Sequence, residues 1–354
     1  MPKPDDIAQG RALWRALLTE DTLNVEERDF SVALLERFCT LLGPSLIDNI
    51  VPGALAPDLV KQARLLAKLT ANRQTQALEM LLGKGHDVIA MKGFATSRLY
   101  HRDATARVTG DLDLLASEGD IQDIVATLEG EGYSVTTDLP MPPWGFVSEA
   151  SYLPMTSADE LVDIDLHIHP DCYPLPLGLT TGEVFENARL VDVSDRAGRP
   201  IKVPSPEHML LIALSNATKE KLGPQSVKSL LDCGRILASE LGLDWTRFNE
   251  MTIKARLKEP SRVVFAVISH LRGEACHGPD GGPMLAASFK GAIQDLATGF
   301  ASGFSFNRKL TREILLTAEP TVTLRRAKDR LIGLFWKRSG IPPGADISAG
   351  RSLN

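Results

Sequence analysis

The sequence predicts an α+β fold in which a small mixed sheet lies between two helical regions. Apolar residues recur every three or four positions toward both ends of the chain, and short β-rich runs separated by helical segments gather in the middle. With 354 residues, 44% of them hydrophobic, the chain can bury a substantial core. We expect an N-terminal helical region over 1–83, an α/β core over 84–204, a C-terminal helical region over 205–338 and a disordered tail over 339–354.

The N-terminal region shows helical periodicity at 12–18, 32–38 and 57–82, without obvious chemistry. In the core, short β-rich runs predict strands at 86–91, 111–115, from Tyr133, 146–155 and 161–168, with helices at 96–100 and 120–131. The second of these helices stops at Gly130 and Gly132. Four further helices follow, at 205–220, 225–241, 245–256 and 260–272. The helix at 205–220 has a clear N-terminal signal, because Ser205 can cap it and Pro206 fits its first turn.

Overall charge and hydropathy exclude some classes of protein. A net charge of −6 and a pI near 5.7 argue against coating nucleic acid, which usually requires a broad basic surface, so we expect no bulk nucleic-acid binding. No apolar run approaches the roughly 18 to 20 residues of a membrane helix, and the first residues are too polar for a signal peptide. We therefore expect no membrane partner and a cytoplasmic location. The scattered residues Cys39, Cys172, Cys233 and Cys276 are predicted to be free thiols.

Paired aspartates on two predicted strands are the most informative feature of the chain. Asp111 and Asp113 lie two residues apart in an apolar-alternating run, so both carboxylates leave the same face of the strand. Asp163 and Asp165 repeat this spacing on a later strand, followed by His167. Carboxylates so close together repel each other unless a cation lies between them, and a divalent metal is the simplest candidate.

Several short motifs follow one another along the chain, namely Met91-Lys92-Gly93, Arg107, Asp111-Leu-Asp113-Leu-Leu, Gly132-Tyr133 and Asp165-Leu-His167. In this order and spacing they resemble the nucleotidyltransferase superfamily of the DNA polymerase beta type. More narrowly, the chain resembles its minimal bacterial, uncharacterised nucleotidyltransferase family over about residues 80–240. The resemblance implies a polymerase-beta-like core. One departure is that Lys92 precedes the glycine and Phe94 follows it, where the superfamily usually has Gly-Ser or Gly-Gly.

The resemblance also implies roles for individual residues. Asp111 and Asp113 would bind metal, and Asp165 would complete the site as a ligand or as the base for an incoming hydroxyl. Asp165 is preferred over Asp163 because it occupies the family's Asp-Leu-His position. The expected nucleotide ligands are Lys92, Gly93, Arg107, Lys219 and Lys228, and the expected supporting residues are His167, Asp163 and Asp232. Arg107 remains open between a phosphate ligand and a structural salt bridge, and the two later lysines between nucleotide ligands and solvated helix residues.

The function implied by this resemblance is transfer of NMP, with AMP favoured, from an NTP to a hydroxyl or phosphate of an acceptor. Two Mg²⁺ ions, with Mn²⁺ as an alternative, would be the cofactors, and ATP the favoured donor. The acceptor stays open between a small molecule, a peptide or protein side chain, and an RNA end. Two other classes are also open. A metal-dependent hydrolase could use the His-x-His run at His167 and His169, and a non-catalytic protein could keep the fold for binding.

Overall fold

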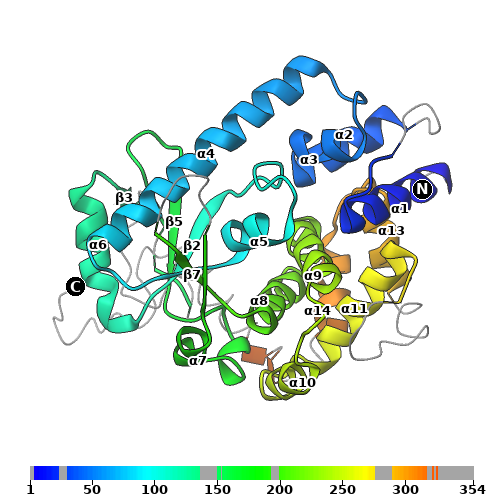
Figure 1. The fold of residues 1–354 in the computed structure, drawn as a ribbon. Helices are drawn as coiled ribbons and strands as arrows, with labels where there is room; N and C mark the ends of the chain where they lie inside the picture. Colours follow the sequence, from blue (N-terminus) through cyan, green and yellow to red (C-terminus); the bar gives the residue numbers. More distant parts are fainter. Residues whose placement is uncertain are drawn as a thin grey trace.

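A computed structural model describes residues 4–23, 30–135, 150–152, 154–192, 199–275, 289–316, 321–322 and 324–325. Over these residues the chain forms thirteen α-helices and one seven-stranded sheet (Figure 1). The predicted mixed sheet with helical flanks is therefore confirmed. No helix within the described ranges is long and apolar enough to cross a membrane.

The sheet joins strands from the whole predicted core. Its strands are β1 (Ile89–Ala90), β2 (Asp111–Leu115), β3 (Ser134–Val135), β4 (Met155–Thr156), β5 (Asp163–His167), β6 (Arg189–Val191) and β7 (Ile201–Val203). Their order across the sheet is β3-β4-β5-β2-β1-β7-β6. β2 runs parallel to β5 and β1 parallel to β7, whereas the remaining neighbours are antiparallel.

The register between β2 and β5 decides how the acidic residues meet. Asp111 lies opposite Asp163, and Asp113 lies opposite Asp165. Partners in a parallel pair project to the same face, so the two acidic runs share one side of the sheet. The leucines and isoleucine between them, at positions 112, 114, 164 and 166, are fully buried on the other side. This apolar alternation fixes the register, because a one-residue slip would bury the aspartates in the core.

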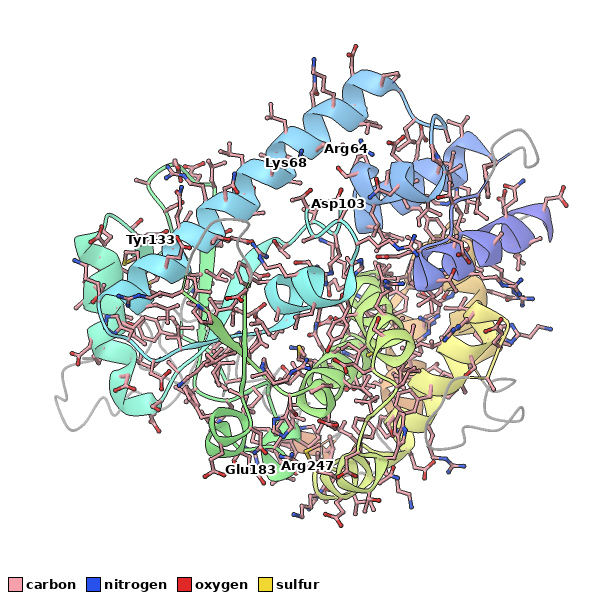
Figure 2. All side chains as sticks on the ribbon, in the orientation of Figure 1. Arg64, Lys68, Asp103, Tyr133, Glu183 and Arg247 are labelled. Atoms are coloured by element: carbon pink, nitrogen blue, oxygen red, sulfur yellow. The ribbon has the colours of Figure 1, made fainter. Side chains whose placement is uncertain are left out.

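Helices surround the sheet. The N-terminal ones are α1 (Pro4–Thr19), α2 (Val32–Leu42), α3 (Pro44–Ile50) and α4 (Pro57–Gly83). Those of the core are α5 (Lys92–Tyr100), α6 (Ile121–Gly130) and α7 (Thr181–Glu186). Those after the sheet are α8 (Pro206–Lys219), α9 (Val227–Ser239), α10 (Trp245–Lys254), α11 (Lys258–Arg272), α13 (Lys290–Ala297) and α14 (Phe306–Leu316). The long α4 extends from α3 toward α6 (Figure 1). Arg64, in the N-terminal half of α4 (Figure 2), forms an ion pair with Asp48 of α3.

The N-terminal and C-terminal helices pack against each other. The Trp14 indole of α1 donates a hydrogen bond to the carbonyl of Leu296 in α13 at 2.9 Å. The two helices approach closely at Gly10, where a Cβ atom would lie 1.5 Å from the carbonyl oxygen of Ala297. One continuous cluster of buried apolar residues contains members of all three predicted regions. The boundaries at 83 and 204 stay predictions.

Several elements differ from the sequence expectation. α5 begins at Lys92, so Lys92 and Gly93 form its first turn instead of a separate loop. β6, β7 and α7 were not predicted, because runs of three to six residues are too short to show a clear period. β4 (Met155–Thr156) shares only Met155 with the predicted strand 146–155, and 146–149 lie outside the described residues, as do Cys276 and the predicted tail 339–354. Cys39, Cys172 and Cys233 form no disulfide among the described residues, in line with the prediction.

Candidate metal centre

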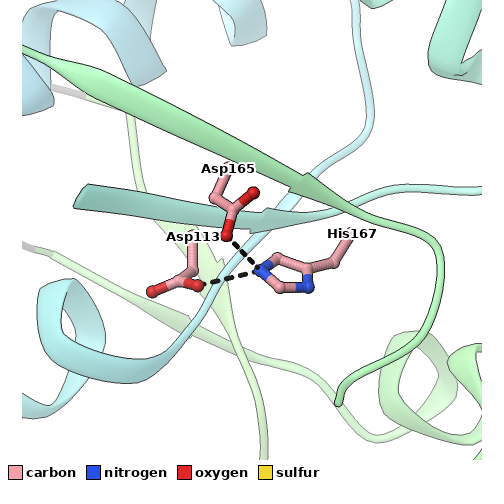
Figure 3. A group of neighbouring side chains, drawn as sticks. All are labelled: Asp113, Asp165 and His167. Atoms are coloured by element: carbon pink, nitrogen blue, oxygen red, sulfur yellow. Dashed lines mark hydrogen bonds and ion pairs between the residues drawn. The ribbon is translucent and has the colours of Figure 1, made fainter. Parts of the chain in front are cut away.

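Three side chains from the two parallel strands converge on one point (Figure 3). One ligand atom from each of Asp113, Asp165 and His167 lies within 4.8 Å of the others, an arrangement that could hold a metal ion. The His167 Nε2 atom is 2.8 Å from Asp113 Oδ1 and 3.5 Å from Asp165 Oδ2. Asp113 and His167 are each only 3% exposed, so these two side chains are buried against the sheet. We refer to Asp113, Asp165 and His167 together as the acidic corner.

Lys92 adds a cation to the same corner. Its Nζ atom donates a hydrogen bond to Asp113 Oδ1 at 2.5 Å and lies 3.2 Å from His167 Nε2. The position follows from the fold, because β1 pairs with β2 and the backbone N–H of Met91 donates to the carbonyl of Asp113 at 2.9 Å. The residue after Met91 is therefore held beside the acidic strand.

The charges of this corner shift one another's pKa values. Burial opposes ionisation of Asp113, yet the Lys92 charge and the hydrogen bond from His167 hold the pKa of Asp113 well below its usual range. The Asp113 carboxylate in turn raises the pKa of Asp111. Burial and Lys92 act to lower the pKa of His167, but its hydrogen bonds to Asp113 and Asp165 raise it overall. Asp113 is therefore ionised near neutral pH, as a metal ligand must be.

The donor set fits a divalent metal. The Asp165 Oδ1 atom is buried and has no hydrogen-bond partner among the described residues, and such an orphaned oxygen costs about 1–3 kcal/mol unless something binds it. A metal ion would satisfy it. Carboxylates suit Mg²⁺ and Mn²⁺, and an imidazole is also found with transition metals, so the ligand types leave the identity of the ion open.

A cavity of about 380 Å³ opens above this group. Its walls come from α5, the segment before β2, β2 and β5 themselves, α8 and α9. Asp111, Asp113 and Asp165 all line it, so the three predicted acids face one space. Asp111 lies outside the group of three metal-ligating side chains, whose third member is His167.

Four cations line the cavity, namely Lys92, Arg107, Lys219 and Lys228. Arg107 is held by Asp232, with Nε donating to Oδ1 at 2.9 Å and Nη2 to Oδ2 at 2.6 Å. Its remaining terminal nitrogen donates to the carbonyl of Val108 at 3.3 Å. This geometry matches the structural alternative for Arg107, and it gives Asp232 the role of its counter-ion.

Lys219 is paired with a residue that sequence reasoning missed. Its Nζ atom donates to Asp171 Oδ1 at 2.9 Å, and the Ser215 hydroxyl donates to Asp171 Oδ2 at 2.8 Å. Burial opposes ionisation, but the Lys219 and Lys92 charges lower the pKa of Asp171 to about 2. Asp171 lies beyond the end of β5 and shows no periodic signal, so only the fold brings it near α8.

Lys228 differs from the other three cavity cations. Its Nζ atom donates to the carbonyl of Val108 at 3.1 Å. Within the described part of the chain, no carboxylate lies within ion-pair distance of it. Burial and the neighbouring Arg107 charge lower its pKa. Lys228 is thus the cavity cation whose charge is least compensated.

Gly93, Asp163 and His169 are the other residues that the sequence singled out, and none of them belongs to the group that could hold a metal ion. A Cβ atom on Gly93 would lie 2.9 Å from Arg107 Nη1 and 3.2 Å from Thr109 Cγ2, so glycine is needed here for close packing. Asp163 accepts a hydrogen bond from the Thr156 hydroxyl at 2.5 Å and is absent from the residues that line the cavity. His169 is not a member of the metal-ligating group found among the described residues.

The fold and site define a mixed α/β protein with a metal-capable group at the base of a cation-lined cavity. The family described as uncharacterised nucleotidyltransferase matches residues 33–273, more than half of the chain, and the protein belongs to this family. The resemblance predicted from the motifs is thereby confirmed. Neither the curated proteins nor the solved structures include a significant match to the chain.

Proposed function

We propose that this protein is a metal-dependent nucleotidyltransferase with a polymerase-beta-like core. It transfers NMP from an NTP, with ATP favoured, to a hydroxyl or phosphate of an acceptor and releases pyrophosphate. The observation that carries the proposal is the pairing of Asp113 with Asp165 in register on two parallel strands, at the base of a cavity lined by cations. Membership of a nucleotidyltransferase family supports it.

Asp113, Asp165 and His167 would hold one divalent ion, and Asp111, which lines the same cavity, would help to hold a second. Mg²⁺ is the favoured ion and Mn²⁺ the alternative. When bound, the metal neutralises charge on the triphosphate and on the leaving pyrophosphate.

The side chains perform the remaining tasks. An acceptor oxygen forms a bond to the α-phosphorus while the bond from that phosphorus to the bridging oxygen breaks, and pyrophosphate carries away the electron pair. The proton of an acceptor hydroxyl passes to a carboxylate, and we assign this role to Asp165 because it lines the same cavity. Lys228 binds the donor phosphates, since its charge is not already neutralised by a carboxylate.

The acceptor remains one of three classes: a small molecule, a peptide or protein side chain, or an RNA end. The net charge of −6 disfavours bulk nucleic acid as the partner. A cytoplasmic location is consistent with such substrates and remains part of the proposal.

The direct test incubates the purified protein with each NTP labelled at the α-phosphate, Mg²⁺ or Mn²⁺, and a broad set of acceptors. We expect label on an acceptor together with an equal amount of pyrophosphate, and loss of both with Asp113→Ala or Asp165→Asn. Failure to bind any NTP and to release pyrophosphate across the whole screen would refute the proposal. Nucleotide binding without turnover would support a non-catalytic binding protein, an alternative that the Lys92–Asp113 ion pair favours.

A further inference from the structure

The Lys92 ammonium contacts two of the side-chain atoms that would bind a metal ion. Its Nζ atom is 2.5 Å from Asp113 Oδ1 and 3.2 Å from His167 Nε2, and both residues belong to the metal-ligating group. An ammonium group in contact with a carboxylate oxygen repels a divalent cation that approaches the same oxygen. The ion pair seen here and metal binding by Asp113 Oδ1 are therefore alternatives.

The backbone at Lys92 is unusual as well. The residue has a φ of +44°, in the left-handed region, at the first position of α5. This conformation is unfavourable for an L-residue with a side chain, and such outliers concentrate where a side chain must be held for function. The lysine side chain is 18% exposed and lines the cavity, so it has space to leave Asp113.

Lys219 provides an internal comparison. It is a second lysine on the cavity wall, and it also forms an ion pair with a buried aspartate, Asp171. Asp171 is not one of the metal-ligating residues. The two lysines thus share location, charge and type of partner, but only Lys92 contacts the metal-ligating atoms.

We propose that Lys92 is an internal competitor for the metal ion. In the metal-free protein its ammonium neutralises Asp113, and it must swing into the cavity, where the triphosphate would lie, before the ion binds. Metal affinity is then set by an exchange of one cation for another, not by the ligands alone. This inference rests on the proposed function, because it takes the group of Asp113, Asp165 and His167 as the metal site.

The first experiment measures Mn²⁺ affinity by electron paramagnetic resonance in the absence of nucleotide. Lys92→Met should bind Mn²⁺ at least about tenfold more tightly than the wild type, since removing the competing charge frees Asp113. Lys219→Met removes the same charge from the same cavity without freeing a metal ligand. Because it leaves the buried Asp171 without its partner, urea unfolding first verifies its fold, and its Mn²⁺ affinity should then stay within about threefold of the wild type. Asp165→Asn should abolish the tight site.

The second experiment uses the wild-type protein and does not depend on whether a variant folds. Reductive methylation followed by mass spectrometry reports how readily each lysine amine reacts. Mg²⁺ or Mn²⁺ should increase the methylation rate of Lys92 severalfold, because the displaced amine becomes accessible. The rate for Lys219 should not change.

The outcomes separate the two proposals. Equal and measurable Mn²⁺ affinities in the wild type and Lys92→Met, or equal gains in Lys92→Met and Lys219→Met, would overturn the competitor role and leave the metal site intact. An unchanged methylation rate of Lys92 at saturating metal would do the same. Absence of Mn²⁺ binding in every variant would instead remove the metal-dependent transferase.

Discussion

Arg107 and Asp232 form a buried two-pronged ion pair that ties the segment before β2 to α9 across 125 residues of sequence. The two residues are 6% and 3% exposed. The pair forms part of the cavity wall, so it fixes the distance between the acidic strand and the helix that carries Lys228. Burial opposes ionisation of Asp232, but Arg107 and His101 lower its pKa.

Loss of one partner of this pair should strongly destabilise the protein. Asp232→Asn leaves the Arg107 guanidinium buried without a counter-charge, and such changes cost about 3–5 kcal/mol. Urea unfolding at pH 7 measures the difference. The double variant Arg107→Met with Asp232→Leu should recover much of the loss, because it removes both charges. A single variant within about 1 kcal/mol of the wild type would show that the pair is not structurally important.

Two glycines near the cavity should respond differently to alanine. Gly93→Ala places a Cβ atom 2.9 Å from Arg107 Nη1, a group held in place by Asp232, and should cost about 1 kcal/mol or more. Gly110→Ala meets no atom within 4 Å and should stay within about 0.5 kcal/mol of the wild type. Thermal or urea unfolding compares them. Equal costs would mean that packing against Arg107 does not explain Gly93.

Lys228→Met should weaken donor binding without changing metal affinity. We expect the KM for the NTP to rise at least about tenfold, because the replaced ammonium has no carboxylate partner among the described residues and is available to phosphate. Mn²⁺ titration should match the wild type. The matched variant is Lys202→Met, whose lysine pairs with Asp87 away from the residues that line the cavity. Similar KM values in both variants would argue against a phosphate role for Lys228.

His208 should make stability depend on pH. It is fully buried in the first turn of α8, and its Nε2 atom lies 3.1 Å from Nη2 of Arg247, which Figure 2 labels. Burial, followed by the Arg247 charge, lowers its pKa from 6.5 to about 4. A neutral imidazole can accept the Arg247 hydrogen bond, whereas a protonated one cannot.

Protonation of His208 in the unfolded chain should make the native protein less stable as the pH falls. As pH falls from about 6.5 to about 4, the unfolded chain gains a proton at His208 that the native protein does not, so this residue's contribution declines by up to about 3 kcal/mol. His208→Gln can keep the contact with Arg247 but cannot take up the proton. Urea unfolding at pH 7 and pH 4.5 should therefore show a smaller loss for the variant. Parallel losses in both proteins would contradict the assignment.

Local patterns in the sequence were sufficient for the parts of the fold that lie near one another in the chain. Alternating leucines and aspartates predicted β2 and β5 and the face on which their acids lie. The cap at Ser205 accepts a hydrogen bond from the backbone N–H of His208 and begins α8 at Pro206, as expected. The short strands β6 and β7 were not predicted from the sequence, because three residues do not establish an alternating pattern.

The same limit applies to the site. The sequence indicated that Asp111, Asp113 and Asp165 would face one space, and the structure places all three on one cavity. It could not show that His167 would join Asp113 and Asp165 in a group that could hold a metal ion, nor that Asp171 would neutralise Lys219. Both outcomes depend on distances between side chains, which periodicity does not report.

By itself, then, the sequence determined the family, the alternating strands and the chemical character of the site, because these depend on residue types at fixed local spacing. Only the tertiary structure decided which charges are paired. The ion pairs of Lys92 with Asp113 and of Arg107 with Asp232 join residues 21 and 125 positions apart. Their energies depend on separation and burial in space, and those quantities exist only once the sheet and helices have packed.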